Sequence, residues 1–331
     1  MQGSRDTSVG EIQTVLGPVS AADLGVTYSH EHLVMRGGLG LAKEPGYVLP
    51  SADKMVEELA SVRAAGGRTV VDMMPIDCGR LPEELVDISQ RSGMHVIAAT
   101  GFHSGFYYDS EHWVHKYSSE QIVDLVVREL TEGMDRRSYG GPIVERIPAR
   151  AGVVKLATEY HYATKTQLKL IESYGEVYRQ TGFPFSTHTE TGTFGLEQVE
   201  LMGKAGVPAN ALVIGHLDRL PDPGYHREVL GTGAFVMYDS ASRAKYGPDS
   251  NLIDILRAMI DGGFGRQILL GTDMARASYL RAYGGGPGMD YLLVRLLPRL
   301  RREGFPDAVL DDIMIRNPAQ AFARRHAGSP A

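Results

Sequence analysis

Two histidines near the N-terminus give the first indication of chemistry in this chain. His30-Glu31-His32 follows an apolar run that begins at Leu24. Side chains alternate between the two faces of a β-strand, so histidines two residues apart point the same way. Neutral imidazole is the commonest protein metal ligand, and such a pair is typical of half of a metal site. Because His-X-His also occurs by chance, this interpretation requires further ligands elsewhere.

Further candidate ligands lie inside or at the ends of later apolar runs. They are Lys155, His188, His216 and Asp273. Taken singly, a histidine at a strand end is more often an ordinary hydrogen-bonded residue. An aspartate there can cap the next helix, and a lysine can extend to solvent or pair with a carboxylate. Their joint occurrence at the ends of several strands favours one shared metal site.

The elements that must position these residues alternate along the chain. We predict eight strands, at residues 25–30, 69–73, 95–100, 152–157, 183–189, 211–216, 234–239 and 267–273. Helical spacing of apolar residues predicts helices at 52–65, 119–132, 166–181, 196–205, 252–260 and 289–302. This alternation predicts an α/β protein with a single (β/α)8 TIM barrel, in which catalytic groups lie at the C-terminal ends of the strands.

The boundaries of the barrel and one alternative fold also follow from the sequence. We predict one domain over residues 1–331, with its core at about 10–325, and two short C-terminal helices that are broken at Pro318 and cover one end of the barrel. A doubly wound open sheet is the alternative. It is disfavoured because no Gly-X-Gly-X-X-Gly turn follows the first strand.

Composition excludes several classes of function. The 331 residues carry a net charge of −6 and no basic stripe, so the sequence does not predict a nucleic-acid partner. No apolar run reaches the roughly 20 residues that span a bilayer, and residues 1–8 lack the apolar segment of a signal peptide. The single cysteine, Cys78, excludes an internal disulfide. We therefore expect a cytoplasmic protein.

The candidate ligands, taken together, resemble those of the amidohydrolase superfamily, most closely its phosphotriesterase-like branch. The resemblance covers roughly residues 10–325 and includes the segments 14–18, 29–33, 99–102 and 317–322. It implies two divalent metal ions, commonly zinc, with manganese, cobalt and iron as alternatives. One ion would be held by His30, His32 and Asp273, and the other by His188 and His216. Lys155 would be carboxylated (N6-carboxylysine) and bridge both.

The same resemblance implies a hydrolytic mechanism. A hydroxide that bridges the two metals would attack the ester, and the more exposed metal would polarise the substrate's carbonyl or phosphoryl oxygen. Asp273 would act as the catalytic residue that accepts the hydroxide's proton. The expected partner is a small ester, and relatives suggest a possible homodimer.

Loops after the last two strands indicate which ester. Barrels often bind phosphate there, and these loops contain Arg243, Lys245, Arg276 and Tyr279. We interpret them as an anion pocket, which favours a phosphorylated sugar lactone, although solvated loop charges are an equally simple explanation. A neutral organophosphate triester would not need these charges.

Other functions remain open on the sequence alone. An acyl-homoserine-lactone lactonase would need an apolar channel, which residues 102–113 could line, although these aromatic residues fit a packed lid better. A non-catalytic barrel with structural metals is a further alternative, yet structural zinc sites are often rich in cysteine. The roles of His103, His112 and His115 are not determined by spacing.

Overall fold

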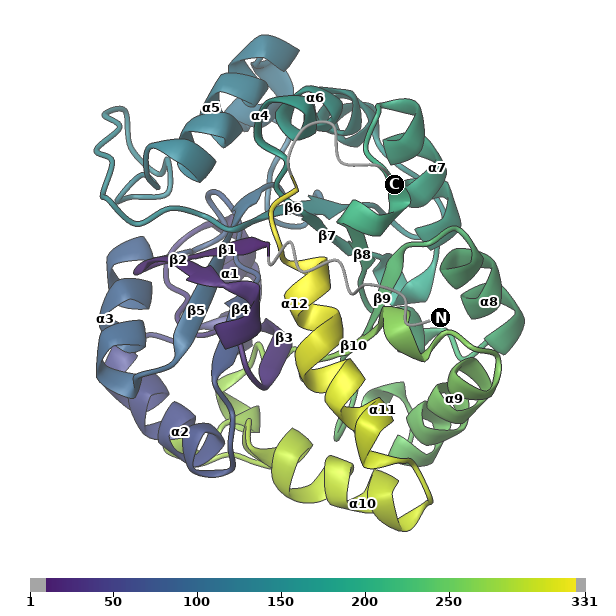
Figure 1. Cartoon of the computed structure of the whole chain (residues 1–331). Helices are drawn as coiled ribbons and strands as arrows, with labels where there is room; N and C mark the ends of the chain where they lie inside the picture. Colours follow the sequence, from purple (N-terminus) through teal and green to yellow (C-terminus); the bar gives the residue numbers. More distant parts are fainter. Residues whose placement is uncertain (1–9, 326–331) are drawn as a thin grey trace.

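The computed structural model describes residues 10–325, which form a barrel of eight parallel strands inside a ring of helices (Figure 1). In barrel order the strands are β3 (Thr27–Glu31), β4 (Thr69–Asp72), β5 (His95–Gly101), β6 (Val153–Ala157), β7 (Phe185–His188), β8 (Leu212–Ile214), β9 (Phe235–Tyr238) and β10 (Ile268–Leu270). All eight predicted strands are therefore present, and the TIM-barrel prediction is confirmed. Except for β5, the observed strands are shorter than predicted, because several strand-end residues already belong to loops.

Helices connect consecutive strands and cover the outside of the barrel. The longer ones are α2 (Ala52–Ala64), α3 (Pro82–Ser92), α5 (Ser119–Thr131), α6 (Lys165–Thr181), α7 (Gly195–Lys204), α8 (Pro223–Gly231) and α9 (Asp249–Asp261). The shorter ones are α1 (Leu39–Lys43), α4 (Trp113–Lys116), α10 (Leu297–Arg302), α11 (Asp307–Asp311) and α12 (Asn317–Ala321). The sequence analysis did not predict α3 or α8, nor the short α1 and α4. A small antiparallel hairpin, β1 (Glu11–Thr14) and β2 (Gly17–Ser20), precedes the barrel.

Local sequence explains where the main helices begin and end. Ser118 and Thr164 start α5 and α6 with complete capping boxes, in which Gln121 and Gln167 bond back to the cap. Gly182 ends α6 in the left-handed conformation, φ 67°, that glycine adopts at little cost. These caps fix the ends of helices that lead into the strands that carry the candidate ligands.

A glutamate side chain joins the first and last strands of the barrel. Glu31 is fully buried and accepts hydrogen bonds from the Thr272 backbone N–H at 2.8 Å and from the Thr272 hydroxyl at 2.6 Å. The backbone adds one bond, from Asp273 N–H to the His30 carbonyl at 3.0 Å. The middle residue of His30-Glu31-His32 therefore brings β3 next to the loop after β10.

The C-terminal helices close the other end of the barrel. Ala321 and Phe322 are buried in a cluster with residues from the barrel interior, which are Val71, Met73, Ile97, Ala99, Val153, Val213, Phe235, Met237 and Leu269. In Figure 1 α12 crosses this end of the barrel. This position agrees with the prediction that the tail covers one end.

The predicted break at Pro318 is wrong. Residues 307–321 form one continuous helix in which a π-helical segment, Asp312–Arg316, precedes the proline. The Asn317 N–H bonds to the Asp312 carbonyl, five residues back. This wider turn accommodates a proline ring that would clash in a regular α-helix. The helix predicted at 289–302 repeats the pattern: it begins only at Tyr291, and π-helical Leu292–Leu296 precedes Pro298.

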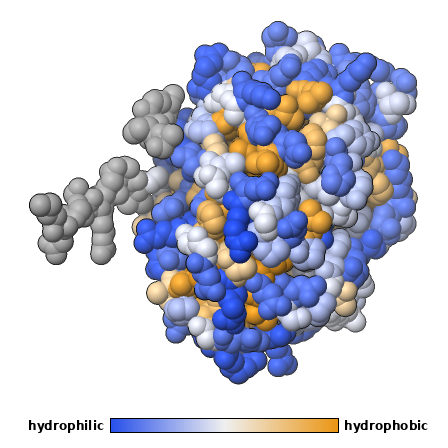
Figure 2. Space-filling view, turned by 90° about the vertical axis from the view of Figure 1, so that its right-hand side faces the viewer, coloured by the Kyte–Doolittle hydropathy of each residue, from blue (hydrophilic) through white to orange (hydrophobic). Residues whose placement is uncertain are grey.

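Within residues 10–325, no helix combines the length and the apolar character that crossing a bilayer requires. Figure 2 shows a face on which hydrophilic side chains surround separate apolar patches. Single apolar groups on a protein surface are normal and do not by themselves indicate a partner.

Candidate metal centre

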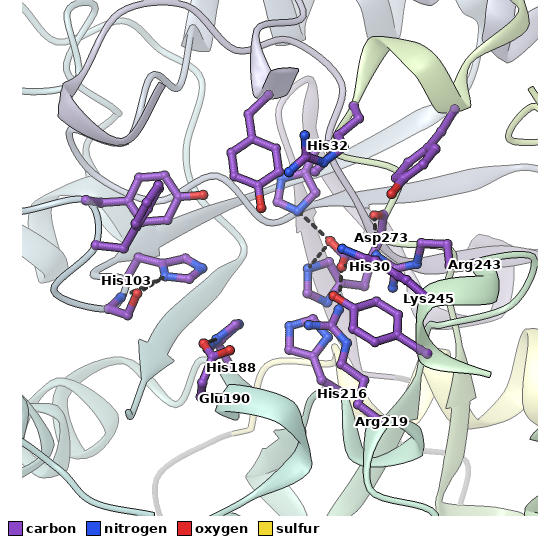
Figure 3. Close-up of a pocket in the computed structure, with 18 residues that line it drawn as sticks. His30, His32, His103, His188, Glu190, His216, Arg219, Arg243, Lys245 and Asp273 are labelled. Atoms are coloured by element: carbon purple, nitrogen blue, oxygen red, sulfur yellow. Dashed lines mark hydrogen bonds and ion pairs between the residues drawn. The ribbon is translucent and has the colours of Figure 1, made fainter. Parts of the chain in front are cut away.

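The six predicted metal ligands come from five strands and meet at one end of the barrel. Lys155 lies in the middle of β6, and His188 is the last residue of β7. His216 and Asp273 lie in the loops after β8 and β10, and His30 lies in β3. His32 follows the end of β3 directly. Figure 3 shows His30, His32, His188, His216 and Asp273 around one cavity. The structure therefore brings His30, His32, His188, His216 and Asp273 to one cavity, while Lys155 lies within β6. Their role as metal ligands stays a prediction.

Asp273 lies within reach of both N-terminal histidines. Its Oδ1 is 2.9 Å from His32 Nε2 and 3.6 Å from His30 Nε2. These three residues form a buried group whose ligand atoms all lie within 4.8 Å of one another, as a metal site requires. The group matches the ligands expected for the first ion.

The four histidine rings lie next to one another, from His32 and His30 of this group to His216 and His188. Ring centroids are 5.4 Å apart for His30 and His32, and 4.9 Å apart for His30 and His216. The rings of His188 and His216 follow at 4.7 Å. The four imidazoles therefore form a continuous set that could serve two neighbouring ions.

Lys155 fits the role of a modified ligand. Its side chain is fully buried, and Nζ has no hydrogen-bond partner among residues 10–325. Burial lowers the pKa of this amine to about 8, so the neutral form is far more accessible than in a solvated lysine. An unprotonated buried amine without a partner is suited to reaction with carbon dioxide, and a carbamate would supply anionic oxygen ligands.

The histidines are held in the state that binds metals. Burial lowers the pKa of His30 to about 4, and burial together with Arg219 lowers the pKa of His216 well below its usual range. Both rings are therefore neutral at physiological pH, the form in which imidazole coordinates a cation.

Two carboxylates contact ring nitrogens of His30, His188 and His216. Asp239 lies 3.1 Å from His30 Nδ1 and 2.8 Å from His216 Nδ1. Glu190 Oε2 lies 3.1 Å from His188 Nε2. The sequence analysis assigned neither residue a role, although Asp239 ends the strand predicted at 234–239 and Glu190 follows His188 by two positions.

Two buried arginines flank Asp273. Arg219 Nη2 and Arg243 Nη1 lie 2.5 Å and 2.8 Å from its Oδ2. Although burial raises the pKa of Asp273, Arg243 and its other partners hold that pKa well below the usual range. Sequence reasoning missed Arg219, and the only signal was its position three residues after His216.

The backbone at two of the predicted ligands is strained. His216 and Asp273 adopt left-handed conformations, with φ of 64° and 45°. Residues other than glycine seldom do so, and such residues cluster at functional sites. At both positions the chain has just left a barrel strand, β8 or β10.

The predicted substrate residues lie on the wall of the same cavity, which encloses about 280 Å³. Lys245, Arg276, Tyr279 and Arg243 all line it. Arg276 stacks over Tyr47 and pairs with Glu44 at 3.3 Å. Lys245 lies over the Tyr246 ring at 4.5 Å and forms no ion pair with any carboxylate in the described part of the chain. Arg243 instead directs its guanidinium at Asp273.

The structure places the three histidines whose roles the sequence left open in different surroundings. His103 lines the cavity, and its Nδ1 accepts a hydrogen bond from the Ser104 N–H at 2.7 Å. His112 caps α4 and lies 3.0 Å from Asp77. His115 contacts Thr166 and the Asp109 carbonyl. Only His103 can therefore contact a substrate, and the other two stabilise the loop after β5.

The aromatic segment after β5 divides between two roles. Phe102, Tyr108 and Trp113 pack together, with Phe102 and Tyr108 buried. Phe106 and Tyr107 line the cavity. The segment is therefore both a packed lid and one wall of the site.

Comparison with known proteins identifies the family. A model of the phosphotriesterase family matches residues 10–322. The chain belongs to the phosphotriesterase family. It is therefore a member of a metal-dependent hydrolase family that acts on ester bonds, and the recognition made from the sequence is confirmed.

Similar proteins within the phosphotriesterase family include lactonases. A phospho-furanose lactonase of Mycoplasmopsis synoviae is 33% identical over 321 residues, covering 94% of this chain and 91% of the relative. A lactonase structure from Listeria monocytogenes superposes with a TM-score of 0.89 at 30% identity, covering 96% and 100% of the two chains. The phosphotriesterase homology protein of Escherichia coli, solved with phosphate in its active site, gives 0.82 at 29% identity, covering 91% and 99%.

Proposed function

We propose that this phosphotriesterase-family hydrolase opens a phosphorylated sugar lactone with two divalent metal ions, preferably zinc. The observation that carries the proposal is Lys245, a cation on the cavity wall without a carboxylate partner in the described chain, beside the histidine cluster. A substrate phosphate would supply the missing anion. The similarity to a phospho-furanose lactonase supports this substrate class.

The proposed metal assignments are those that the family resemblance implies, and the buried group of His30, His32 and Asp273 supports the first of them. His30, His32 and Asp273 would hold one ion, His188 and His216 the other, and carboxylated Lys155 both. Bound ions of this kind polarise a carbonyl oxygen and lower the pKa of a water molecule. The donor set also suits manganese, cobalt or iron.

The residues around the ions would orient the lactone. Lys245 would bind the substrate phosphate as a point charge, and Arg276 could offer two parallel hydrogen bonds after exchanging Glu44 for phosphate. Tyr279 would donate a further hydrogen bond. Asp273, fixed on its Oδ2 side by Arg219 and Arg243, presents Oδ1 to the reaction centre and is the proposed acceptor of the water proton.

A second candidate function rests on the aromatic part of the cavity wall, which includes the Tyr47 ring that Arg276 stacks on. Tyr47, Phe106 and Tyr107 line it and would suit an acyl chain or an aryl leaving group. This wall favours an acyl-homoserine lactone or an organophosphate triester as the alternative substrate. The cationic wall would contribute little to the binding of these neutral compounds.

A substrate panel tests the proposal. The zinc- or manganese-loaded enzyme is assayed with phosphorylated aldonolactones, free aldonolactones, acyl-homoserine lactones and an aryl phosphotriester. Charge-assisted hydrogen bonds contribute about 1.5–3 kcal/mol, so Lys245→Ala or Arg276→Ala should raise KM roughly 10- to 100-fold for the phosphorylated lactone alone. Lys204→Ala, at an exposed site on α7, is the control. Equal effects on phosphorylated and free lactones would refute the anion pocket.

We also propose a cytoplasmic location for this enzyme. The one cysteine, Cys78, is buried and unpaired, which supports a cytoplasmic location without disulfide chemistry. The small ester is the proposed partner, and a homodimer stays a prediction that sedimentation velocity measures directly.

A further inference from the structure

We propose that Asp239 is a positioning residue that orients a histidine of each metal site at once. The inference rests on the two-metal assignment of the proposed function. Asp239 follows β9 and is fully buried. Its Oδ2 lies 3.1 Å from His30 Nδ1, and its Oδ1 lies 2.8 Å from His216 Nδ1. One carboxylate thus contacts a ligand of the first ion and a ligand of the second.

The contact determines which ring nitrogen faces the metal. A neutral imidazole carries its proton on one nitrogen, and a carboxylate accepts that proton's hydrogen bond. His216 Nδ1 is hydrogen-bonded to Asp239 Oδ1, and Asp239 Oδ2 is a carboxylate oxygen within 3.1 Å of His30 Nδ1. Protons on the two Nδ1 atoms would leave the lone pairs on the two Nε2 atoms. His30 and His216 line the cavity, whereas Asp239 lies behind them and does not. Figure 3 shows both rings turned toward the cavity.

Asp239 is itself fixed from the far side. Arg243 Nη2 donates to the Asp239 backbone carbonyl at 2.5 Å, and the guanidinium lies 3.6 Å from Oδ1. Arg219 Nη2 lies 3.5 Å from the same oxygen. A buried carboxylate is stable only when it is paired, and these arginines provide the pairing. They also contact Asp273, so one charge network connects the ligands of both ions.

The alternative is that Asp239 is itself a metal ligand. Its oxygens, His30 and His216 do form a group with ligand atoms within 4.8 Å of one another. An ion placed there would use the Nδ1 atoms. It would then lie on the side of His30 away from Asp273, whose Oδ1 is 3.6 Å from His30 Nε2. Because Asp273 and the cavity are on the Nε2 side, the geometry favours positioning over direct coordination.

Glu190 provides a matched comparison within the same chain. Its Oε2 contacts Nε2 of one histidine only, His188, at 3.1 Å. Loss of the Glu190 carboxylate should lower the affinity of the protein for one ion, whereas loss of Asp239 should lower its affinity for both. Outer carboxylates of this kind typically change metal affinity 10- to 100-fold.

The test measures metal binding directly. Zinc affinities are obtained by competition with a chromophoric chelator, and stoichiometry by elemental analysis, for wild type, Asp239→Ala, Asp239→Asn and Glu190→Gln. Asp239→Ala should lower the affinity for both zinc ions by about 10- to 100-fold. Asp239→Asn keeps one acceptor oxygen and should lower the affinity for at least one zinc ion. Glu190→Gln should lower the affinity for only one zinc ion. Near-ultraviolet circular dichroism of each metal-free variant confirms that it is folded.

Several outcomes would overturn the inference. Wild-type affinity for both ions in a folded Asp239→Ala protein would exclude a positioning role. Complete loss of one ion at saturating zinc, with the other unchanged, would show that Asp239 is a ligand. If the wild-type protein bound no divalent cation, the proposed function itself would fail. Binding of two ions without a phosphorylated-lactone activity would leave the inference intact and refute only the substrate.

Discussion

His226 shows how a single buried residue can connect stability to pH. It is fully buried, and its Nε2 donates to the carbonyls of Leu217 and Leu220, each at 2.9 Å. Its Nδ1 lies 3.0 Å from the Tyr238 hydroxyl, which donates to it when the ring is neutral. Burial lowers the pKa of His226 below 6.5, so the folded state favours the neutral ring.

This arrangement predicts a pH-dependent contribution to stability. Below pH ~6.5 the unfolded chain binds a proton at this position before the folded chain does, so the free energy of unfolding falls as pH falls. His226→Gln does not titrate. The stability difference between wild type and this variant should therefore shrink between about pH 7.5 and 5.5. Urea unfolding of the metal-free proteins measures it, and a constant difference would contradict the assignment.

At the scale of elements, Glu31 decides how the barrel closes. Because it accepts bonds from the backbone and side chain of Thr272, it substitutes for strand pairing between β3 and the chain after β10. Glu31→Gln replaces one acceptor oxygen with a donor and should lower the free energy of unfolding of the metal-free protein by about 1–3 kcal/mol.

Thr272→Val is the comparison for this effect. It removes only the hydroxyl and leaves the backbone bond, so a smaller loss, about 1 kcal/mol, is expected. Urea titration of both variants provides the values. A Glu31→Gln protein that is as stable as wild type would show that β3 and the chain after β10 are held together by backbone bonds and packing alone.

A buried ion pair connects α5 to the loop before α3. Arg80 and Glu129 are fully buried and form two parallel bonds, at 2.8 Å and 2.7 Å. Removing one partner leaves an uncompensated charge, so Glu129→Ala should cost about 3–5 kcal/mol. Asp87→Ala, which removes an exposed partner of Arg91, should cost no more than about 1 kcal/mol. Thermal and urea unfolding distinguish the two, and similar costs would refute the argument.

At the scale of the whole molecule, the metals and the fold have separable roles. The barrel interior and the outer helices contain extensive buried clusters that do not include the histidine ligands. Removal of metal with a chelator should therefore abolish ester hydrolysis and lower Tm without unfolding the chain, because a bound ligand stabilises only by its binding free energy. Calorimetry with and without chelator tests this, and unfolding on chelation would instead favour a structural role for the metals.

Much of the site was predictable because a parallel barrel follows a simple rule. The C-terminal ends of all its strands face the same edge, so Lys155, His188, His216 and Asp273 had to approach the His30 pair once eight strands were recognised. The hydrophobic pattern of short buried strands carries this information locally. The barrel and the meeting of these residues at one end of it were therefore determined by the sequence itself, whereas their role as metal ligands stays a proposal.

Only the tertiary structure decided how these groups are held. Asp239 and His30 are 209 positions apart, yet their side chains lie 3.1 Å apart. Arg243, predicted as a substrate contact, is directed at Asp273, and Glu31 joins two strands that are distant in sequence. The helix through Pro318 continues because a preceding π-turn accommodates the ring. Such contacts depend on distances between separate segments, which strand and helix periodicity does not specify, whereas the residues at each strand end are set by the local pattern.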